Sequence, residues 1–186
     1  MPPPARLGSC RKIKIDIQSP YWHLTGALRA AYRITLMSAE VLFTRERSVA
    51  GRIERLIKNA GASFDAALYR FTSDRLARAL DEAQERGVRV RLVLDRGKYE
   101  QSETARRLLA RGRFAVRLAH GRDGAGSKMH HKFALLDDSV LLTGSYNWTT
   151  ESEEQNYENL LVLREPELIA TYRPEFEALW AEASET

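Results

Sequence analysis

From about residue 40 onward, hydrophobic positions switch repeatedly between strand-like runs and helical spacing. Short apolar runs that predict strands occupy residues 40–43, 64–71, 88–95, 114–118 and 160–163. Apolar residues recur at helical spacing over 49–59, 73–86 and 102–111, and a proline at 166 opens a last helical stretch to about residue 180. Strands that alternate with helices predict the α/β class, with a mixed, mainly parallel β-sheet flanked by helices on both faces.

A different pattern follows the fourth strand. The apolar runs 133–136 and 140–142 are close together and predict a β-hairpin with its turn at Asp138 and Ser139. His130 and Lys132 precede the first run, and because side chains alternate along a strand they project to the same face. His131 projects to the other face. An imidazole beside an ammonium group can grip one phosphate, the imidazole as a nucleophile and the ammonium as a counter-charge for the non-bridging oxygens.

The second strand of the hairpin also ends in polar residues. Ser145 and Asn147 are two positions apart and offer a hydroxyl group and an amide group on one face. Asp137 lies five residues after Lys132 and therefore points to the opposite face, so we expect it to brace the hairpin. The alternative is an ordinary buried hairpin with a histidine at its edge, but a lysine is rarely buried without a reason.

These residues form one spaced motif. It is H-x-K-x4-D-x6-G-S-x-N, with His130, Lys132, Asp137, Gly144, Ser145 and Asn147. The motif resembles the signature of the phospholipase D superfamily, whose members cut or exchange phosphodiesters. In its single-motif bacterial endonucleases and the similar mitochondrial Zucchini-type proteins, a glutamate precedes the next strand, where this chain has Glu158. The resemblance implies that Glu158 orients His130 by accepting its Nδ1 proton; a solvated loop carboxylate is the alternative.

The resemblance has a consequence for assembly. Displacement at phosphorus by a histidine needs a second acid to protonate the departing oxygen, and larger members of the superfamily carry two copies of the motif. This chain has one copy. We therefore expect a homodimer with a shared active site, in which one His130 forms a phosphohistidine and its twin donates the proton. Four histidines and one cysteine form no dense ligand pattern, so no metal and no cofactor are expected.

Charge is unevenly distributed along the 186 residues. Residues 101–132 hold eight Lys or Arg and two acidic residues, whereas residues 133–186 hold two basic and twelve acidic residues. A basic segment that leads into the motif would attract a polyanion. Arg122 and Lys128 are candidate phosphate-binding residues, and Trp148 is a candidate platform for base stacking. Solvated surface charges, and a tryptophan in the core or dimer interface, are the alternatives.

The sequence also indicates how the chain is divided into domains and where the protein is located. We expect one phospholipase D-like catalytic domain over residues 39–186, preceded by an N-terminal extension of unknown role over residues 1–38, in which residues 13–17 alternate like a strand. No apolar run is long enough to span a bilayer and no signal peptide is clear, so we expect a cytoplasmic location without stable membrane insertion. A transit peptide is the alternative.

Three functions are consistent with these patterns. The leading prediction is a metal-independent phosphodiesterase, an endonuclease that cleaves single-stranded DNA or RNA without strict sequence preference. The second is a phospholipase D-type hydrolase of phospholipids or cardiolipin, which would use the same residues. The third is an inactive nucleic-acid-binding module, although binding alone does not require His130 and Glu158 together.

Overall fold

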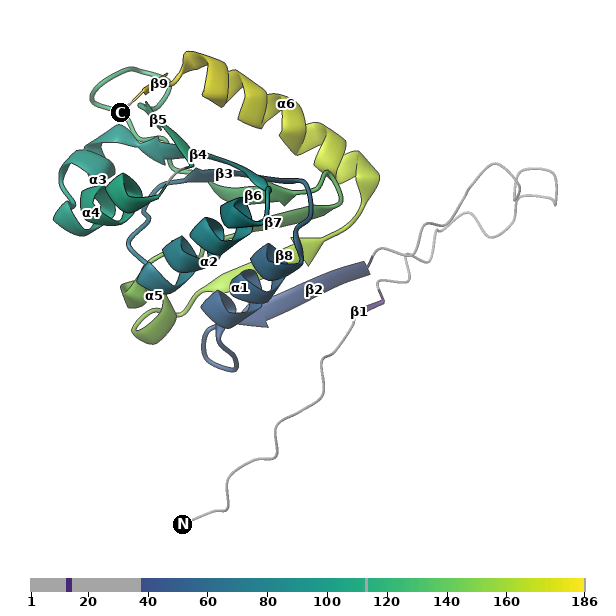
Figure 1. Ribbon diagram of the computed structural model, residues 1–186. Coiled ribbons are helices and arrows are strands. Elements are labelled where there is room, and N and C mark those ends of the chain that lie inside the picture. The colour runs from purple at the N-terminus through teal and green to yellow at the C-terminus, as the bar shows by residue number, and fades with distance from the viewer. Residues whose placement is uncertain (1–12, 15–37, 113, 186) are drawn as a thin grey trace, which may run out of the picture.

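The computed structural model describes residues 13–14, 38–112 and 114–185 (Figure 1). Most of the predicted N-terminal extension, and Arg113 of the basic segment, lie outside the described residues. The described strands form one sheet in the order β1-β2-β8-β7-β6-β3-β4-β5-β9. Their bounds are β1 Ile13–Lys14, β2 Ser38–Phe43, β3 Ser63–Leu68, β4 Arg89–Asp95, β5 Ala115–Ala119, β6 Lys132–Leu136, β7 Val140–Gly144, β8 Asn159–Leu163 and β9 Ser184–Glu185.

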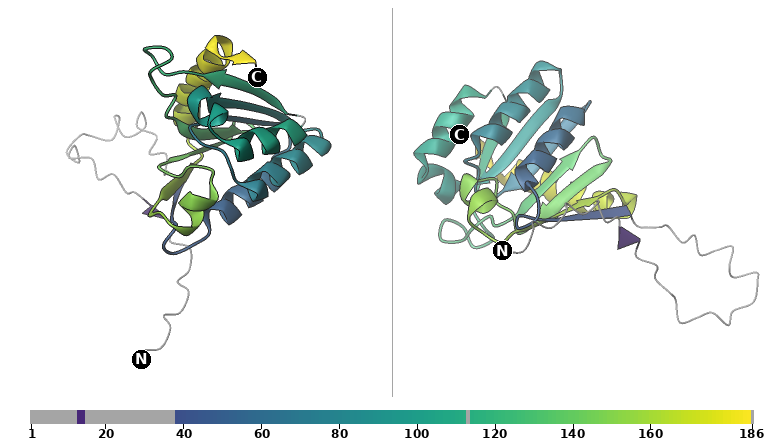
Figure 2. Two further views of the ribbon diagram at one scale, coloured as in Figure 1. Left: turned by 90° about the vertical axis from the view of Figure 1, so that its left-hand side faces the viewer. Right: turned by 90° about the horizontal axis from the view of Figure 1, so that it is seen from below.

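Helices cover both faces of the sheet, as the sequence predicts (Figures 1 and 2). The helices are α1 Val49–Asn59, α2 Asp74–Glu85, α3 Arg96–Glu100, α4 Glu103–Arg111, α5 Thr150–Glu154 and α6 Pro166–Glu182. One apolar core lies between the sheet and α1, α2 and α4, and a second lies between the sheet and α6. None of the helices in the described ranges is long and apolar enough to cross a membrane.

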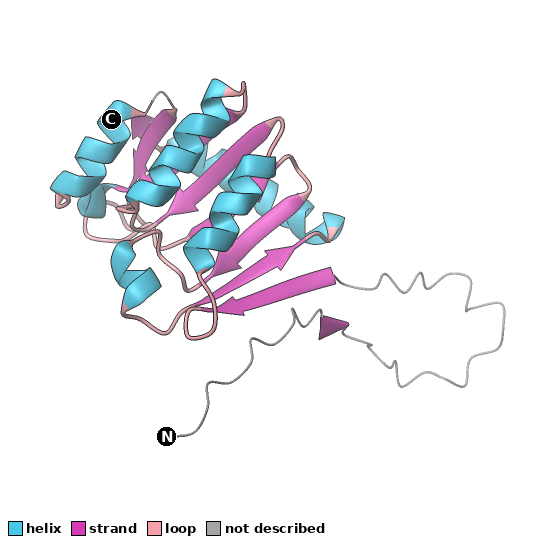
Figure 3. Ribbon diagram, turned by 60° about the horizontal axis from the view of Figure 1, so that its bottom comes forward, coloured by secondary structure: helices cyan, strands magenta, loops and turns pink. Residues whose placement is uncertain are grey.

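The balance of strand directions differs from the expectation of a mainly parallel sheet. Among the described strands, only the pairs β3·β4 and β4·β5 are parallel, and the other pairs are antiparallel (Figure 3). Parallel neighbours need a crossover, and α2 and the α3–α4 pair supply one each. Strands β6, β7 and β8 follow one another through a tight turn and the short α5, which leads to antiparallel pairing.

Helix starts agree with the capping signals in the sequence. The Ser73 hydroxyl accepts a hydrogen bond from the Leu76 N–H at 3.4 Å and begins α2, and Ser102 does the same for α4 through Ala105 at 3.1 Å. The predicted strand at 64–71 ends earlier, at Leu68, because the chain there leaves the sheet. Helices α3 and α5 have five residues each, too few to show a period in the sequence.

This topology places several strand ends at one edge of the sheet. The carboxyl ends of β3, β4 and β7 lie beside the amino ends of β6 and β8, since β6 runs antiparallel to β3 and β7, and β8 runs antiparallel to β7. Ligands of α/β proteins commonly bind outside such carboxyl ends. All the motif residues except Asp137 lie at this edge.

Candidate active site

His130 and Lys132 lie together at this edge. The His130 side chain is exposed, Lys132 is half-buried, and the Lys132 ammonium nitrogen is 3.2 Å from Nδ1 and 3.4 Å from Nε2 of the imidazole. The ammonium also donates a hydrogen bond to the His130 carbonyl oxygen at 2.9 Å. The imidazole therefore faces solvent beside the lysine, which is the arrangement that a phosphate would need.

The surroundings of His130 favour its neutral form. Partial desolvation of the ring lowers the pKa of the imidazole below its usual value, the positive charges of Lys132 and Lys128 lower it further, and the Asp95 carboxylate acts in the opposite direction. A neutral imidazole keeps a nitrogen lone pair for attack on phosphorus. Burial also lowers the pKa of Lys132, while the carboxylate of Glu158 acts in the opposite direction, which places Glu158 near the ammonium group.

Two residues outside the predicted site hold the histidine segment in place. The Tyr69 ring, at the end of β3, lies with its centroid 4.3 Å from the His130 ring, and the Tyr69 N–H donates to the His131 carbonyl at 2.8 Å. Asp95 is buried at the end of β4, and its carboxylate accepts a hydrogen bond from the Met129 N–H at 2.9 Å. A polar residue that directly follows the apolar strand 88–94 is the sequence signal for Asp95.

Glu158 does not make the predicted contact with His130. Its carboxylate accepts hydrogen bonds from the Ser145 hydroxyl, from the Ser152 hydroxyl at 3.3 Å and from the Asn156 side chain at 3.4 Å. Ser145 in turn accepts a hydrogen bond from the Asn159 N–H at 3.1 Å. The prediction fails because the serines around β7 and α5 satisfy the carboxylate, which leaves it close to Lys132 instead of the imidazole.

The remaining motif residues shape the same edge. A Cβ atom at Gly144 would lie 2.3 Å from the Asn159 carbonyl oxygen, so the close approach of β7 and β8 requires glycine. The Asn147 side chain is half-buried, and within the described part of the chain its Oδ1 is buried without a hydrogen-bond partner. Of this side chain, only the amide nitrogen could donate a hydrogen bond to a phosphoryl oxygen, because Oδ1 is an acceptor.

Asp137 lies at the other end of the hairpin. Its carboxylate accepts hydrogen bonds from the N–H groups of Gly61, Ala62 and Ser63 at 2.9, 2.8 and 2.8 Å. Its backbone has a positive φ of 52°, which aspartate tolerates better than most residues. The hydrogen bonds tie the hairpin turn to the start of β3 and have no contact with the imidazole edge.

The prediction that Trp148 stacks on substrate is wrong. Trp148 is only 2% exposed, and its ring centroid lies 5.7 Å from that of Phe64 and 5.8 Å from that of Phe71. Tyr146 is also buried and donates its hydroxyl to Glu153 at 2.9 Å. Both rings are packed in the apolar core because burial removes their apolar surface from water, so neither can stack on the bases of a substrate.

The predicted phosphate-binding residues Arg122 and Lys128 are both exposed, in the loop between β5 and β6. Lys128 is close enough to His130 for its charge to act on the imidazole. The structure thus places both residues on the loop that leads to His130.

Comparison with known proteins agrees with this fold and motif. Residues 53–180 match the family described as "Cardiolipin synthase, PLD-like domain". The chain belongs to this phospholipase D-like family, as the motif predicts.

The human mitochondrial cardiolipin hydrolase is 38% identical over 139 residues, which are 75% of this chain and 54% of that protein. The chain spans about half the length of the curated cardiolipin hydrolases that it matches. Among solved structures, the phospholipase D family member Nuc from Salmonella typhimurium has a TM-score of 0.73 at 24% identity, covering 81% of this chain and 98% of that chain. NucT from Helicobacter pylori has the same TM-score at 22% identity, covering 81% and 99%. The two structures show the shared fold.

Proposed function

We propose that this protein is a metal-independent phosphodiesterase that cleaves single-stranded DNA or RNA. The observation that carries the proposal is the cationic surrounding of the exposed His130, with Lys132 in contact with the ring and Lys128 close enough to act on it. Positive charge at and beside a nucleophile suits a substrate with a phosphate on either side of the scissile one. The basic loop that carries Arg122 extends the same field.

The proposed mechanism has two displacements at phosphorus. A nitrogen of His130 attacks, a P–N bond forms and the P–O bond to the departing strand breaks, while a protonated His130 of the partner subunit gives its proton to the leaving oxygen. The now neutral twin then takes a proton from water, whose oxygen displaces the histidine. Lys132 and Asn147 hold the phosphoryl oxygens, and the Glu158–Ser145 pair positions Lys132.

The homodimer is part of the proposal, because within one described chain His131 does not share the site of His130. The His131 side chain lies 3.1 Å from Glu175 of α6, on the other face of the sheet. We infer that the second imidazole is His130 of a second copy. Excess His130→Ala protein, mixed with wild type and allowed to exchange subunits, should reduce wild-type turnover. Full activity of a monomer at nanomolar concentration would contradict the shared site.

The test of the activity is an assay in EDTA with circular single-stranded DNA, RNA or phospholipid vesicles. Wild type should cleave a nucleic acid, and His130→Ala should reduce turnover at least about a thousandfold. His131→Ala is the matched control, because it removes the neighbouring imidazole from the opposite face and should retain activity. Cleavage that EDTA abolishes in wild type would refute the metal-independent mechanism. Nucleic-acid binding without turnover would indicate the inactive binding module.

Phospholipid hydrolysis is the second candidate, and one surface feature favours it. Phe43 and Tyr157 are 49% and 80% exposed, the large hydrophobic side chains most open to solvent among the described residues. Together with Glu158 they border a hollow of about 410 Å³ beside the proposed site. Similarity to relatives named cardiolipin hydrolase also favours a phospholipid substrate. Turnover of cardiolipin vesicles without nucleic-acid cleavage would establish this alternative. The cytoplasmic location also stays a proposal, which cell fractionation tests against a mitochondrial one.

A further inference from the structure

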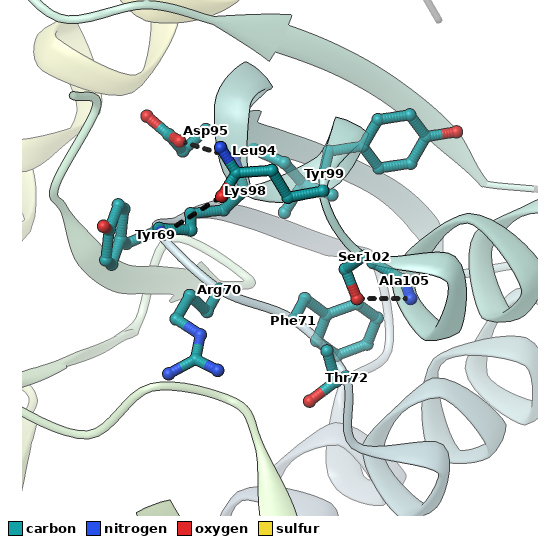
Figure 4. A pocket seen from close by; sticks show the side chains of 11 residues that line it. Tyr69, Arg70, Phe71, Thr72, Leu94, Asp95, Lys98, Tyr99, Ser102 and Ala105 are labelled. Atoms are coloured by element: carbon teal, nitrogen blue, oxygen red, sulfur yellow. Dashed lines mark hydrogen bonds between the residues drawn. The ribbon is translucent and has the colours of Figure 1, made fainter. Parts of the chain in front are cut away.

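A pocket of about 260 Å³ opens next to the proposed active site (Figure 4). It lies where β3 and β4 end, between the segment 69–72 and the chain from Asp95 through the start of α4. Tyr69 belongs to both places, since it lines the pocket and its ring centroid is 4.3 Å from that of His130. A group in the pocket would therefore adjoin a phosphate held at His130.

The pocket contributes its own positive charge. The Lys98 ammonium nitrogen lies 5.8 Å from the centroid of the Tyr69 ring, and the Lys132 ammonium nitrogen lies 5.1 Å from the same point. Two ammonium groups, one in the active site and one in the pocket, therefore lie near the same tyrosine ring. Because both distances share one end point, the two nitrogens are at most about 11 Å apart, so one short stretch of a charged strand could contact both.

Lys98 is the pocket cation best placed to bind an anion. Its ammonium donates a hydrogen bond to the neutral side-chain oxygen of Gln101 at 3.3 Å, which leaves its charge uncompensated by that contact. Arg70, which also lines the pocket, is paired with the carboxylate of Glu151 at 2.7 Å. A phosphate would have to displace a carboxylate at Arg70, but only an amide at Lys98.

The residues that line the pocket also favour a polar occupant over an apolar one. The Lys98 ammonium and the Gln101 amide are poor surroundings for an acyl chain, because their polar groups would lose water without gaining hydrogen bonds. A sugar and its phosphate can satisfy them. The volume is below the roughly 300–1,000 Å³ of pockets that enclose a drug-sized ligand, which limits the occupant to a small unit.

We propose that this pocket is a subsite for the nucleotide that adjoins the scissile phosphate, with Lys98 binding the next phosphate along the strand. The proposal rests on the proposed nuclease function and deepens it. It predicts that one flanking phosphate on a defined side of the cleaved bond accelerates turnover.

Three matched substrates test the subsite: a dinucleoside monophosphate, and the same compound with one added phosphate at its 5′ end or at its 3′ end. Each contains a single cleavable diester. In wild type, one of the two phosphorylated compounds should have a kcat/KM about tenfold above that of the parent, a factor that corresponds to about 1.4 kcal/mol. Lys98→Gln should bring this ratio close to one, and Lys98→Arg should retain part of it.

Lys58→Gln is the matched control. It removes the same charge from the carboxyl end of α1, at the opposite end of the sheet, and should leave the ratio as in wild type. A wild-type ratio near one, or a ratio that Lys98→Gln does not change, refutes the subsite alone. A protein that cleaves longer nucleic acids but none of the three compounds also refutes it. A protein that cleaves no nucleic acid of any length refutes the proposed function, and the subsite with it.

Discussion

Replacing Asp137 by alanine removes an acceptor that serves three backbone N–H groups at once. One carboxylate oxygen accepts from Ala62 and Ser63, and the other accepts from Gly61. A hydrogen bond to a charged group typically stabilises a protein by about 1.5–3 kcal/mol. The part-buried bond from Ser63 should contribute about 1.5 kcal/mol, and the two bonds exposed to water about half of that each, so we expect a total loss of about 3 kcal/mol.

Asparagine should cost less than alanine at this position. Asp137→Asn keeps one oxygen acceptor and the tolerance for positive φ, and it loses the charge and one hydrogen bond, so we expect a loss of about 1 kcal/mol. For a chain of this length, about 3 kcal/mol corresponds to a fall in Tm of roughly 6–12 °C.

The pH dependence provides an independent check. Burial raises the pKa of Asp137, but the hydrogen bonds from Ser63, Gly61 and Ala62 outweigh it and hold the pKa below its usual value. A lowered pKa in the folded state adds stability that is complete above the unfolded pKa and is lost as pH falls through the folded one. The difference between wild type and Asp137→Asn should therefore be largest near neutral pH and shrink below about pH 4.

Urea denaturation of wild type and both variants measures these differences. Asp123→Asn, which changes an exposed aspartate in the loop between β5 and β6, is the control and should be neutral. Turnover per folded molecule should stay near that of wild type, since the carboxylate has no contact with the imidazole edge. If Asp137→Ala kept its stability and lost turnover, the assignment of Asp137 to bracing the hairpin would be wrong.

Three further changes test other parts of the structure. Gly144→Ala should destabilise the protein by about 2 kcal/mol or more in urea denaturation, because the new methyl group would meet the Asn159 carbonyl oxygen at 2.3 Å; wild-type stability would show that β7 and β8 separate freely. Tyr69→Ala should lower kcat and change its pH profile, whereas Tyr69→Phe should restore both, since the ring and not the hydroxyl contacts His130; equal effects of the two variants would refute this. Burial raises the pKa of Asp65, but two arginine partners lower it below its usual value, so its contribution to stability is present above the unfolded pKa and lost as pH falls through the folded one. Asp65→Asn should therefore cost about 3 kcal/mol at neutral pH and progressively less below about pH 4; a constant difference across this range would count against the ion pairs.

Most helices and strands were predictable because their signals are local. The serine caps of α2 and α4, the apolar runs of β4 and β8 and the proline at the start of α6 each lie within the element they define. The short α3 and α5 and the early end of β3 were not predictable. These features depend on where the chain leaves the sheet, which no short window of sequence records.

The site was predictable in part for the same reason. His130 and Lys132 are two residues apart at the start of β6, so their proximity follows from the geometry of an extended chain. Glu158 and Trp148 were placed wrongly, because their neighbours come from elsewhere in the chain. Ser152 on α5 helps to draw the carboxylate away from the imidazole, and Phe64 on β3 helps to bury the indole.

The amino-acid sequence by itself determined the motif, the family and the pairing of imidazole with ammonium, since each depends on residues that are close along the chain. Only the tertiary structure decided the contact of Tyr69 with His130, the anchoring of the histidine segment by Asp95 and the pocket with Lys98. These groups come from the ends of different strands. They meet because strand pairing aligns those ends at one edge of the sheet, a result of long-range packing that local patterns do not contain.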